Sequence, residues 1–461
     1  MVFTDLTFLF AFLPIVWLVY RFFIARTPLA NLYIFVASMI FYAWGGLRSL
    51  AILLLVLLWN YLSAKRIAME EDLPRRKMIL WIALGVDLLV LFFYRYLGVW
   101  FGFASNALSR LPSLMPLGLS FYLFSCMSCV IDVYRDGGIA PDSFVNFGVL
   151  AAFFGHVNMG PIVHYAKFQK QIKSHPLTRR KTTQGMTLLL QGMFRKVILA
   201  DNLALVFAAL AGNTTWLGNL VYGFSYFFML YFDFSGYSRM ARGIGALFGF
   251  EIPKNFDLPY TALSVQDFWR RWHISLTDWF RDYVYIPLGG NRVSHTRWML
   301  NVLCVWLLTG LWHGATLPFL VWGLYQGAMI LLERSFLNKI LEKLPKFVRH
   351  IYLVLAQLIG WTFFCSGDIA SGFAVVGRYF GIGATGAADS MALFVFSASM
   401  MLLIVCIVLS SGLSVLLGRM VCRLSGKAAN AVSTIGWVCM FAVCVAMLVS
   451  ASAQTFLYAA F

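Results

Sequence analysis

The stretch "MVFTDLTFLFAFLPIVWLVYRFF" (residues 1–23) is an almost unbroken run of apolar and aromatic side chains. A helix needs about 20 such residues to cross roughly 30 Å of hydrocarbon, so this run is long enough to span a membrane. It has no basic residues ahead of its apolar part and no small-residue cleavage site. We therefore expect a first transmembrane helix here and not a removable signal peptide.

Similar apolar runs recur along the whole chain. Of its 461 residues, 61% are hydrophobic and only 12% are charged, whereas a soluble domain carries about 25% charged residues. The runs are continuous, unlike the short alternating segments of a membrane β-barrel. The sequence therefore predicts an all-α polytopic membrane protein with about 11–13 transmembrane helices. Crossings are expected near residues 7–25, 29–45, 49–64, 78–103, 115–134, 184–210, 217–236, 350–366, 391–418 and 431–454, with a shorter hairpin over 298–333.

The net charge of +17 comes largely from loops between these runs. Basic loops lie at 65–77, 167–181, 334–349 and, more weakly, 419–427, and charge-poor loops lie at 104–114, 211–217 and 366–390. Cytoplasmic loops of membrane proteins are enriched in Lys and Arg, so we expect the first group in the cytoplasm and the second group, with the N-terminus, outside. This distribution explains the positive charge without a nucleic-acid partner.

Two segments do not fit simple crossings. Residues 143–165 are interrupted by "GHVNMGP" (155–161), and residues 253–292 contain prolines and many charges. Irregular or charged backbone at membrane depth is stable only where protein or a water-filled cavity surrounds it. We therefore predict that both are re-entrant or interfacial elements that line a cavity, within a single membrane domain comprising residues 1–461.

The cysteines give little indication of chemistry. Cys126 and Cys129 form a CxxC pair, but it lies within a predicted crossing, with no second pair and no nearby histidine. We interpret both as small apolar residues and expect no metal site.

The second irregular segment contains "DFWRRWHISLTDWFRDYVYIPLGGNR" (267–292). If residues 266–285 form one helix, five polar side chains share one face. They are Gln266, Arg270, His273, Thr277 and Arg281. Such a helix either lies in the cytoplasmic interface, with Trp and Arg at headgroup level, or in addition presents His273 to a cavity. The two interpretations are compatible.

The remaining charges of this stretch are expected to pair locally. Asp267 and Arg271 are four residues apart and should attract. Asp278 and Asp282 should repel each other unless Arg281 lies between them.

Further ionisable residues interrupt the apolar runs. In "GLWHGA" (310–315), His313 either has a function or only bonds a neighbouring helix, and its flanking glycines allow backbone or ligand to approach closely. In "YFDFSGYSRMA" (231–241), Asp233 either pairs with Arg239 or Arg242 or faces the cavity. In "GMFRKVILADNLA" (192–204), we expect Arg195 and Lys196 to snorkel or to form ion pairs, with Asp201 nearby.

Two histidines without a well-placed cysteine nucleophile indicate general acid–base chemistry. A neutral imidazole can take the proton of a hydroxyl that attacks an acyl thioester, and arginines at the cytoplasmic mouth can bind the phosphates of a carrier such as coenzyme A. These residues alone leave two possibilities open, a histidine-based membrane enzyme and a proton-coupled transporter. A transporter is expected to show paired repeats or matching broken helices, and the sequence has neither.

Six ordered motifs resemble the membrane-bound O-acyltransferase family, in particular its bacterial polysaccharide branch of alginate O-acetyltransferase-like proteins. They are "PLGLSFYLFSCMSCVIDVYR" (116–135), "GPIVHYAKF" (160–168), "FRKVILADNLA" (194–204), "YFDFSGYSRMARGIGALFGFEIPKNFDLPY" (231–260), "FWRRWHISLTDWFRDYVYIPLGGNR" (268–292) and "GLWHGA" (310–315). The resemblance covers most of residues 1–330, and the C-terminal helices within 350–461 match in hydropathy only.

The resemblance implies a ring of helices around a central funnel in the bacterial inner membrane. His313 matches the family's catalytic base, and His273 matches a second histidine that assists. Arg270, Arg271, Arg281, Asp233 and Trp312 are then candidates for contacts with substrate or donor.

The resemblance also implies a reaction and its partners. The enzyme is expected to hold no bound cofactor and to pass acetyl groups from a cytoplasmic thioester, acetyl-CoA, towards a secreted polysaccharide such as alginate or cellulose. A periplasmic or membrane-anchored partner acyltransferase is expected to complete the modification. The alternative within the family is a D-alanyl or other acyl transfer from a carrier protein, as in the teichoic-acid pathway.

Overall fold

The computed structural model describes residues 1–104, 110, 114–135, 139–413, 415–416 and 427–450. Within these residues the chain is helical, and the only β-type pairing is an isolated antiparallel bridge between Phe256 and Trp272. The all-α prediction is therefore confirmed.

The first half of the chain forms a set of mostly apolar helices, with the polar helices α9 and α10 towards its end. They are η1 (Phe8–Phe12), α1 (Leu13–Val19), η2 (Tyr20–Ile24), α2 (Ala30–Ala43), α3 (Leu47–Met69), α4 (Leu73–Phe92), η3 (Phe93–Leu97), α5 (Gly98–Phe101), η4 (Gly102–Ala104), α7 (Leu119–Arg135), α8 (Phe144–Ala152), α9 (Tyr165–Lys173), α10 (Arg179–Met193), η6 (Phe194–Ala200) and α11 (Asp201–Ala209). The predicted crossings 7–25, 29–45 and 49–64 coincide with η1–η2, α2 and α3 to within a few residues.

The second half contains the longest helix, α12, together with several other long helices and a number of short ones. They are α12 (Trp216–Leu247), η7 (Pro259–Thr261), α13 (Val265–Trp269), α14 (Ile274–Phe280), η8 (Arg281–Tyr285), α15 (His295–His313), α16 (Leu317–Leu332), η9 (Glu333–Leu337), α17 (Asn338–Leu341), α18 (Lys346–Cys365), α19 (Ile369–Tyr379), α20 (Ser390–Ser410) and α22 (Lys427–Ser450).

Several helical stretches meet the requirements for crossing a membrane. Four are long and apolar enough by themselves, namely Leu47–Met69, Leu73–Phe101, Lys346–Cys365 and Ser390–Ser410. Shorter apolar helices cover Phe8–Ile24, Ala30–Ala43 and Thr434–Ser450. The chain is therefore a multi-pass membrane protein, and the number of 11–13 crossings stays a prediction.

Two predicted boundaries are wrong. The crossing expected to end at residue 236 lies in a helix that continues to Leu247, because no proline intervenes and the glycines there pack closely against α10, as Gly236 and Gly243 do. The charge-poor loop 366–390 contains α19, which begins at an Asp368 cap whose side chain accepts a hydrogen bond from the Ser371 backbone N–H. Most of the loops 104–114 and 419–427 lie outside the described residues.

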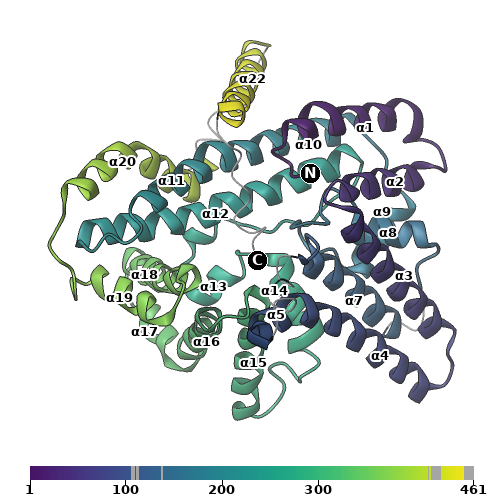
Figure 1. Cartoon of the computed structure of the whole chain (residues 1–461), viewed down its shortest axis with the longest axis horizontal. Helices are drawn as coiled ribbons and strands as arrows, with labels where there is room; N and C mark the ends of the chain where they lie inside the picture. Colours follow the sequence, from purple (N-terminus) through teal and green to yellow (C-terminus); the bar gives the residue numbers. More distant parts are fainter. Residues whose placement is uncertain (105–109, 111–113, 136–138, 414, 417–426, 451–461) are drawn as a thin grey trace.

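Figure 1 shows how these helices are arranged. The N-terminal helices α1–α4 and α7 lie on one side of the molecule, α16–α20 lie on the other, and α15 lies near the centre at the bottom of the view. The long α12 runs across both halves, and the short α13 and α14 lie near the middle. The irregular motif segment is thus surrounded by longer helices, in the manner expected of a ring around a central site.

Glycines bring α10 and α12 close together. A Cβ added to Gly185 would lie 2.8 Å from the carbonyl oxygen of Gly243, and one added to Gly236 would lie 2.9 Å from that of Gly192. In a membrane, where lipid tails are as apolar as side chains, such close backbone contact is a main source of helix association. This packing holds α12 closely against α10.

The irregular segment within 143–165 is enclosed by protein. After α8, residues 153–164 turn without forming a helix and are buried. Their backbone N–H groups find side-chain acceptors, as Phe154 donates to Ser38 Oγ (3.0 Å) and Ile162 donates to Ser275 Oγ (3.0 Å). Protein therefore surrounds this irregular backbone, and its re-entrant or interfacial place in the membrane stays a prediction.

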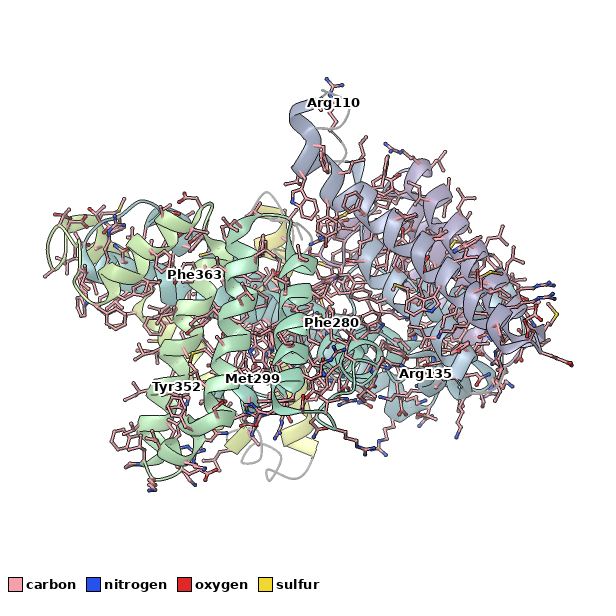
Figure 2. The ribbon with its side chains drawn as sticks, turned by 90° about the horizontal axis from the view of Figure 1, so that it is seen from below. Arg110, Arg135, Phe280, Met299, Tyr352 and Phe363 are labelled. Atoms are coloured by element: carbon pink, nitrogen blue, oxygen red, sulfur yellow. The ribbon has the colours of Figure 1, made fainter. Side chains whose placement is uncertain are left out.

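Figure 2 views the molecule at right angles to Figure 1. Arg110, from the loop expected outside, lies at one edge, whereas Arg135, Met299 and Tyr352 lie towards the opposite edge. Tyr352 follows the basic loop 334–349 that is expected in the cytoplasm. Arg110 and Tyr352 thus lie towards opposite edges, and the cytoplasmic and outer placement of the two loop classes stays a prediction.

Candidate active site

A cavity of about 350 Å³ brings the two predicted histidines together. Both are deeply buried, with only 2% of His273 and 4% of His313 exposed. The cavity is lined by Gln266, Trp269, Arg270, Trp272, His273, Leu276, Thr277, Phe280, Arg281, Tyr285, Val302, Val305, Trp306, Thr309, His313, Trp322, Ile330, Arg334 and Trp361. Both histidines therefore sit at its protected inner part.

The predicted single helix over 266–285 is wrong. The chain forms α13, breaks at residues 270–273 and resumes as α14. His273 stands at the break with φ 44° and ψ 52°, the left-handed conformation that non-glycine residues rarely adopt. Such strained backbone persists only where its surroundings determine it, and it is frequent at functional sites.

Asn255 holds this break in place. Its carbonyl oxygen accepts a hydrogen bond from the Ile274 N–H (3.0 Å), and its Oδ1 accepts from the Ser275 N–H (3.0 Å) and Oγ–H (2.7 Å). On the other side of the break, Arg271 offers its carbonyl oxygen to the Asp257 N–H (2.9 Å). The segment before α13 thus sets the direction in which His273 points.

The five polar residues predicted to share a face all line the cavity. They come from α13, the break, α14 and η8, which together form one wall of the cavity. The spacing thus identified the right set of residues from the wrong local structure.

His313 is the last residue of α15, followed by an extended Gly314. Its ring meets those of Trp312, Trp322 and Phe364, with centroid distances of 4.6, 5.0 and 4.9 Å. The Trp312 ring also lies 6.0 Å from the ring of His273. Trp312 therefore packs against both histidines and keeps them in a fixed relation, without lining the cavity itself.

Three side chains from η3 and α5, at the end of the apolar stretch Leu73–Phe101, donate hydrogen bonds to backbone carbonyl groups around His313. Arg95 Nη2 donates to the His313 carbonyl oxygen (2.8 Å), Tyr96 Oη to that of Leu311 (2.9 Å) and Trp100 Nε1 to that of Ala315 (3.0 Å). Carbonyls at a helix C-terminus lack helical partners, so these donors satisfy groups that would otherwise be exposed. Sequence reasoning missed this contact, although a lone arginine within an apolar run was a visible signal.

The neighbouring glycines serve backbone packing. A Cβ on Gly310 would lie 2.5 Å from the Phe319 carbonyl oxygen, and one on Gly314 would clash with the Phe319 ring. The close approach predicted for these positions is made by α16, which folds back on α15.

Arginines lie at the outer part of the cavity. Arg270 and Arg334 are exposed, and the side chain of Arg281 is 52% exposed. Arg281 bridges Asp278 and Asp282, with N–O distances of 2.8 Å to each, so the predicted relief of their repulsion is confirmed. The cavity therefore runs from a cationic mouth to a buried histidine end. Arg334 was not predicted as a site residue.

Arg271 and Asp233 lie elsewhere. Arg271 Nε pairs with Asp267 (3.0 Å), as predicted, and Arg271 is not among the cavity residues. Asp233 pairs with Lys196 (2.8 Å) and not with Arg239 or Arg242, and Lys196 also binds Asp201 (2.8 Å). The ion-paired role expected for Lys196 is confirmed, and Asp233 helps to join α12 to η6.

Glu333 is a further residue that the sequence did not single out. Its two carboxylate oxygens accept hydrogen bonds from the backbone N–H groups of Val265 (2.6 Å) and Gln266 (2.8 Å), and Oε1 also accepts from Tyr352 (3.0 Å). The carboxylate thus satisfies N–H groups at the start of α13, where a helix favours negative charge. It ties the histidine segment to α16 and α18.

Comparison with known proteins shows which family has this sequence. The sequence model of MBOAT, the membrane-bound O-acyltransferase family, matches residues 142–375, which include both histidines and all the residues that line the cavity. The chain belongs to the membrane-bound O-acyltransferase family. The expected resemblance is therefore confirmed, and the protein is an O-acyltransferase enzyme.

Individual relatives of this O-acyltransferase cover most of its length. "Probable alginate O-acetylase AlgI" of Pseudomonas putida is 36% identical over 403 residues, 83% of this chain and 81% of the relative. "Peptidoglycan O-acetyltransferase" of Helicobacter pylori is 32% identical over 429 residues, 82% of this chain and 79% of the relative. "Teichoic acid D-alanyltransferase" of Bacillus subtilis is 29% identical over 272 residues, 54% of this chain and 67% of the relative.

The cysteines of this O-acyltransferase lie apart from the site. Cys126 and Cys129 are buried in α7, and neither lines the histidine cavity. Among the described residues, no group of three His, Cys, Asp or Glu side chains is placed to hold a metal ion. Apart from the indole N–H groups, the buried polar side chains among the lining residues are those of His273, Thr309 and His313.

Proposed function

We propose that this enzyme is an inner-membrane O-acetyltransferase that takes acetyl groups from acetyl-CoA on the cytoplasmic side and passes them on for O-acetylation of a secreted polysaccharide. The observation that carries the proposal is a single cavity with arginines at its mouth and two buried histidines at its inner end. Relatives whose names refer to alginate and to peptidoglycan favour a polysaccharide as the final acceptor.

His313 acts as the general base in this proposal. Its imidazole takes the proton of an acceptor hydroxyl while the oxygen attacks the carbonyl carbon of the thioester. The new C–O bond forms, the C–S bond breaks, and the proton passes from the imidazolium to the departing thiolate. No covalent enzyme intermediate is needed.

His273 assists from the other side of Trp312 by orienting the acyl group or polarising its carbonyl. Arg270 and Arg334 bind the phosphates of the donor at the mouth, because neither is ion-paired to a carboxylate in the described part of the chain, whereas Arg281 already bridges two aspartates. Guanidinium groups bind phosphate oxygens with paired N–H donors.

The acetyl group leaves the enzyme on the outer side, where a periplasmic or membrane-anchored partner acyltransferase completes the transfer to alginate, cellulose or a similar polymer. The second candidate is D-alanyl transfer from a carrier protein. It is favoured by the likeness to the Bacillus subtilis relative, which covers a smaller share of this chain.

Donor identity can be tested with the purified protein and radiolabelled acetyl-CoA. Release of free thiol with label on a partner or on an acceptor hydroxyl is the expected result. Turnover with an aminoacyl carrier protein but not with acetyl-CoA would replace the proposal with the second candidate. Transport of an intact polymer without any thioester cleavage would identify a transporter.

The role of His313 requires a matched pair of variants. His313→Ala should abolish acetyl transfer while the protein reaches the membrane in normal amounts. His295→Ala, at the exposed start of the same helix, is the control and should retain activity. Retained activity in His313→Ala would remove this residue from the mechanism.

A further inference from the structure

A second cavity, of about 470 Å³, lies beside α12 and apart from the histidine cavity. Its inner walls come from α10, η6, α12 and the irregular segment at residues 254–258, and its outer wall comes from α20 and α22. It is lined by Gln191, Phe194, Arg195, Tyr231, Ser235, Ser238, Arg239, Arg242, Lys254, Asn255, Phe256, Asp257, Leu258, Leu409, Val415, Trp437 and Met440.

Three arginines in this cavity are held by neutral acceptors. Arg195 Nη1 donates to Ser235 Oγ (2.9 Å), Arg239 Nη1 to Gln191 Oε1 (2.5 Å) and Arg242 Nε to the Ile252 carbonyl oxygen (3.4 Å). These contacts orient the guanidinium groups and leave their positive charge in place.

The remaining charges of the cavity cancel. Lys254 pairs with Asp257 (2.6 Å), and Asp257 is the only carboxylate among the lining residues given above. Within the described part of the chain, none of the three arginines has an ion pair with an aspartate or glutamate. Four cations and one carboxylate therefore leave three positive charges in one partly buried space.

Like charges held together away from bulk water are costly, so they are typically matched by a counter-ion. The planar N–H fork of arginine fits the oxygens of a phosphate group. The charge and geometry thus point to a phosphate ligand.

The outer wall of the cavity indicates what carries that phosphate. Leu409, Trp437 and Met440 supply apolar surface from the two helices next to it, and Val415 is 42% exposed, so the cavity reaches the surface between α20 and α22. The outward faces of α20 are strongly apolar, with Phe394 69% and Met401 70% exposed. A ligand entering here would come from the lipid side and would bring an apolar portion.

We propose that this cavity binds the phosphate headgroup of an anionic phospholipid, with Arg195, Arg239 and Arg242 around the phosphate and an acyl chain between α20 and α22. An aromatic layer separates it from the histidine cavity. Tyr231 and Phe256 line the phosphate cavity and Trp272 lines the histidine cavity, with ring centroids 5.9 Å apart for Tyr231–Phe256 and 5.0 Å apart for Phe256–Trp272. The inference therefore does not depend on the proposed donor or reaction.

Native mass spectrometry of the full-length protein, released from nanodiscs of mixed phosphatidylglycerol and phosphatidylcholine, tests this site. We expect one retained phosphatidylglycerol per protein and little phosphatidylcholine. Arg195→Gln, Arg239→Gln and Arg242→Gln should each reduce this occupancy at least tenfold, whereas Arg297→Gln, on the exposed start of α15, should leave it unchanged.

Competition distinguishes the sources of phosphate. Inorganic phosphate and coenzyme A, each added at the concentration of the lipid, should not displace phosphatidylglycerol. Displacement by either one would overturn the lipid assignment, and so would full occupancy in all three arginine variants. If the arginine variants fail to reach the membrane, Met440→Glu places a carboxylate in the outer wall without removing a cation. Undiminished phosphatidylglycerol binding in that variant would also overturn the proposal.

Discussion

Arg95 donates a hydrogen bond of 2.8 Å to the backbone carbonyl oxygen of His313, across 218 residues of sequence. This contact, with those of Tyr96 and Trp100, fixes the C-terminal end of α15 at three carbonyls. The position of the proposed base is therefore determined by a helix from the other half of the molecule.

Removing the Arg95 guanidinium should lower the turnover rate more than the affinity for the acyl donor. Arg95→Met should lower kcat about a hundredfold, because a displacement of about 1 Å at a reacting group has an effect of that size. Arg95→Lys should recover part of the loss, and KM for the donor should change little in either variant. Arg48→Met, at an exposed arginine of α3, serves as the control. An unchanged kcat in Arg95→Met would show that the contact does not position His313.

Two substitutions of His273 should distinguish the contribution of its imidazole to catalysis from the effect of its strained backbone on stability. Asparagine tolerates the left-handed conformation, so His273→Asn should keep the melting temperature while lowering kcat about 10–100-fold. His273→Val should lower both, because a β-branched residue at φ 44° is strained. Thermal unfolding in detergent and steady-state acetyl transfer measure the two effects. Full activity in His273→Asn would exclude an assisting role for the imidazole.

The buried cluster around Lys196 should be important for stability. Lys196→Met removes the cation shared by Asp201 and Asp233 and should destabilise the protein by about 3–5 kcal/mol, because buried carboxylates lose their partner. Adding Asp233→Asn should restore part of the melting temperature.

The matched surface pair is Lys173 and Asp142, which lie 3.4 Å apart with more than half of each side chain exposed. Lys173→Met should cost about 0–1 kcal/mol. Equal effects of the two lysine substitutions on thermal unfolding would contradict a structural role for the buried cluster.

The hairpin of α15 and α16 depends on close backbone contact. A side chain at Gly323 would meet the Trp306 carbonyl oxygen and lie 3.2 Å from the Gly310 Cα, so Gly323→Leu should separate the helices and reduce both yield and activity. Gly85→Leu in α4 is the control, because nothing lies within 4 Å of its added Cβ. Wild-type activity in Gly323→Leu would mean that the hairpin does not need this contact.

The fold and the candidate site were predictable from the sequence to different extents. Apolar run length located most helices, since it reflects the thickness of a bilayer. The polar set around His273 was found by helical spacing, yet the left-handed break was not, because it depends on hydrogen bonds from Asn255, some 20 residues earlier in the chain.

Partners across the molecule were the hardest to predict. Asp233 has arginines close by in sequence, but Lys196 is the cation that reaches it. Glycines bring α12 close to α10 and η6, and η6 contains Lys196. The roles of Arg95 and Glu333 likewise depend on which helices become neighbours. The local residue pattern of a single sequence does not show which helices pack together.

Five tryptophans line the histidine cavity: Trp269, Trp272, Trp306, Trp322 and Trp361. Their broad apolar faces leave few hydrogen-bonding sites for ordered water next to a bound thioester. Hydrolysis competes with transfer wherever water reaches an activated acyl group, and a dry wall suppresses that side reaction. In the proposed reaction, this wall lets the enzyme hold its acyl donor while the acceptor is absent, with little loss of the donor to hydrolysis.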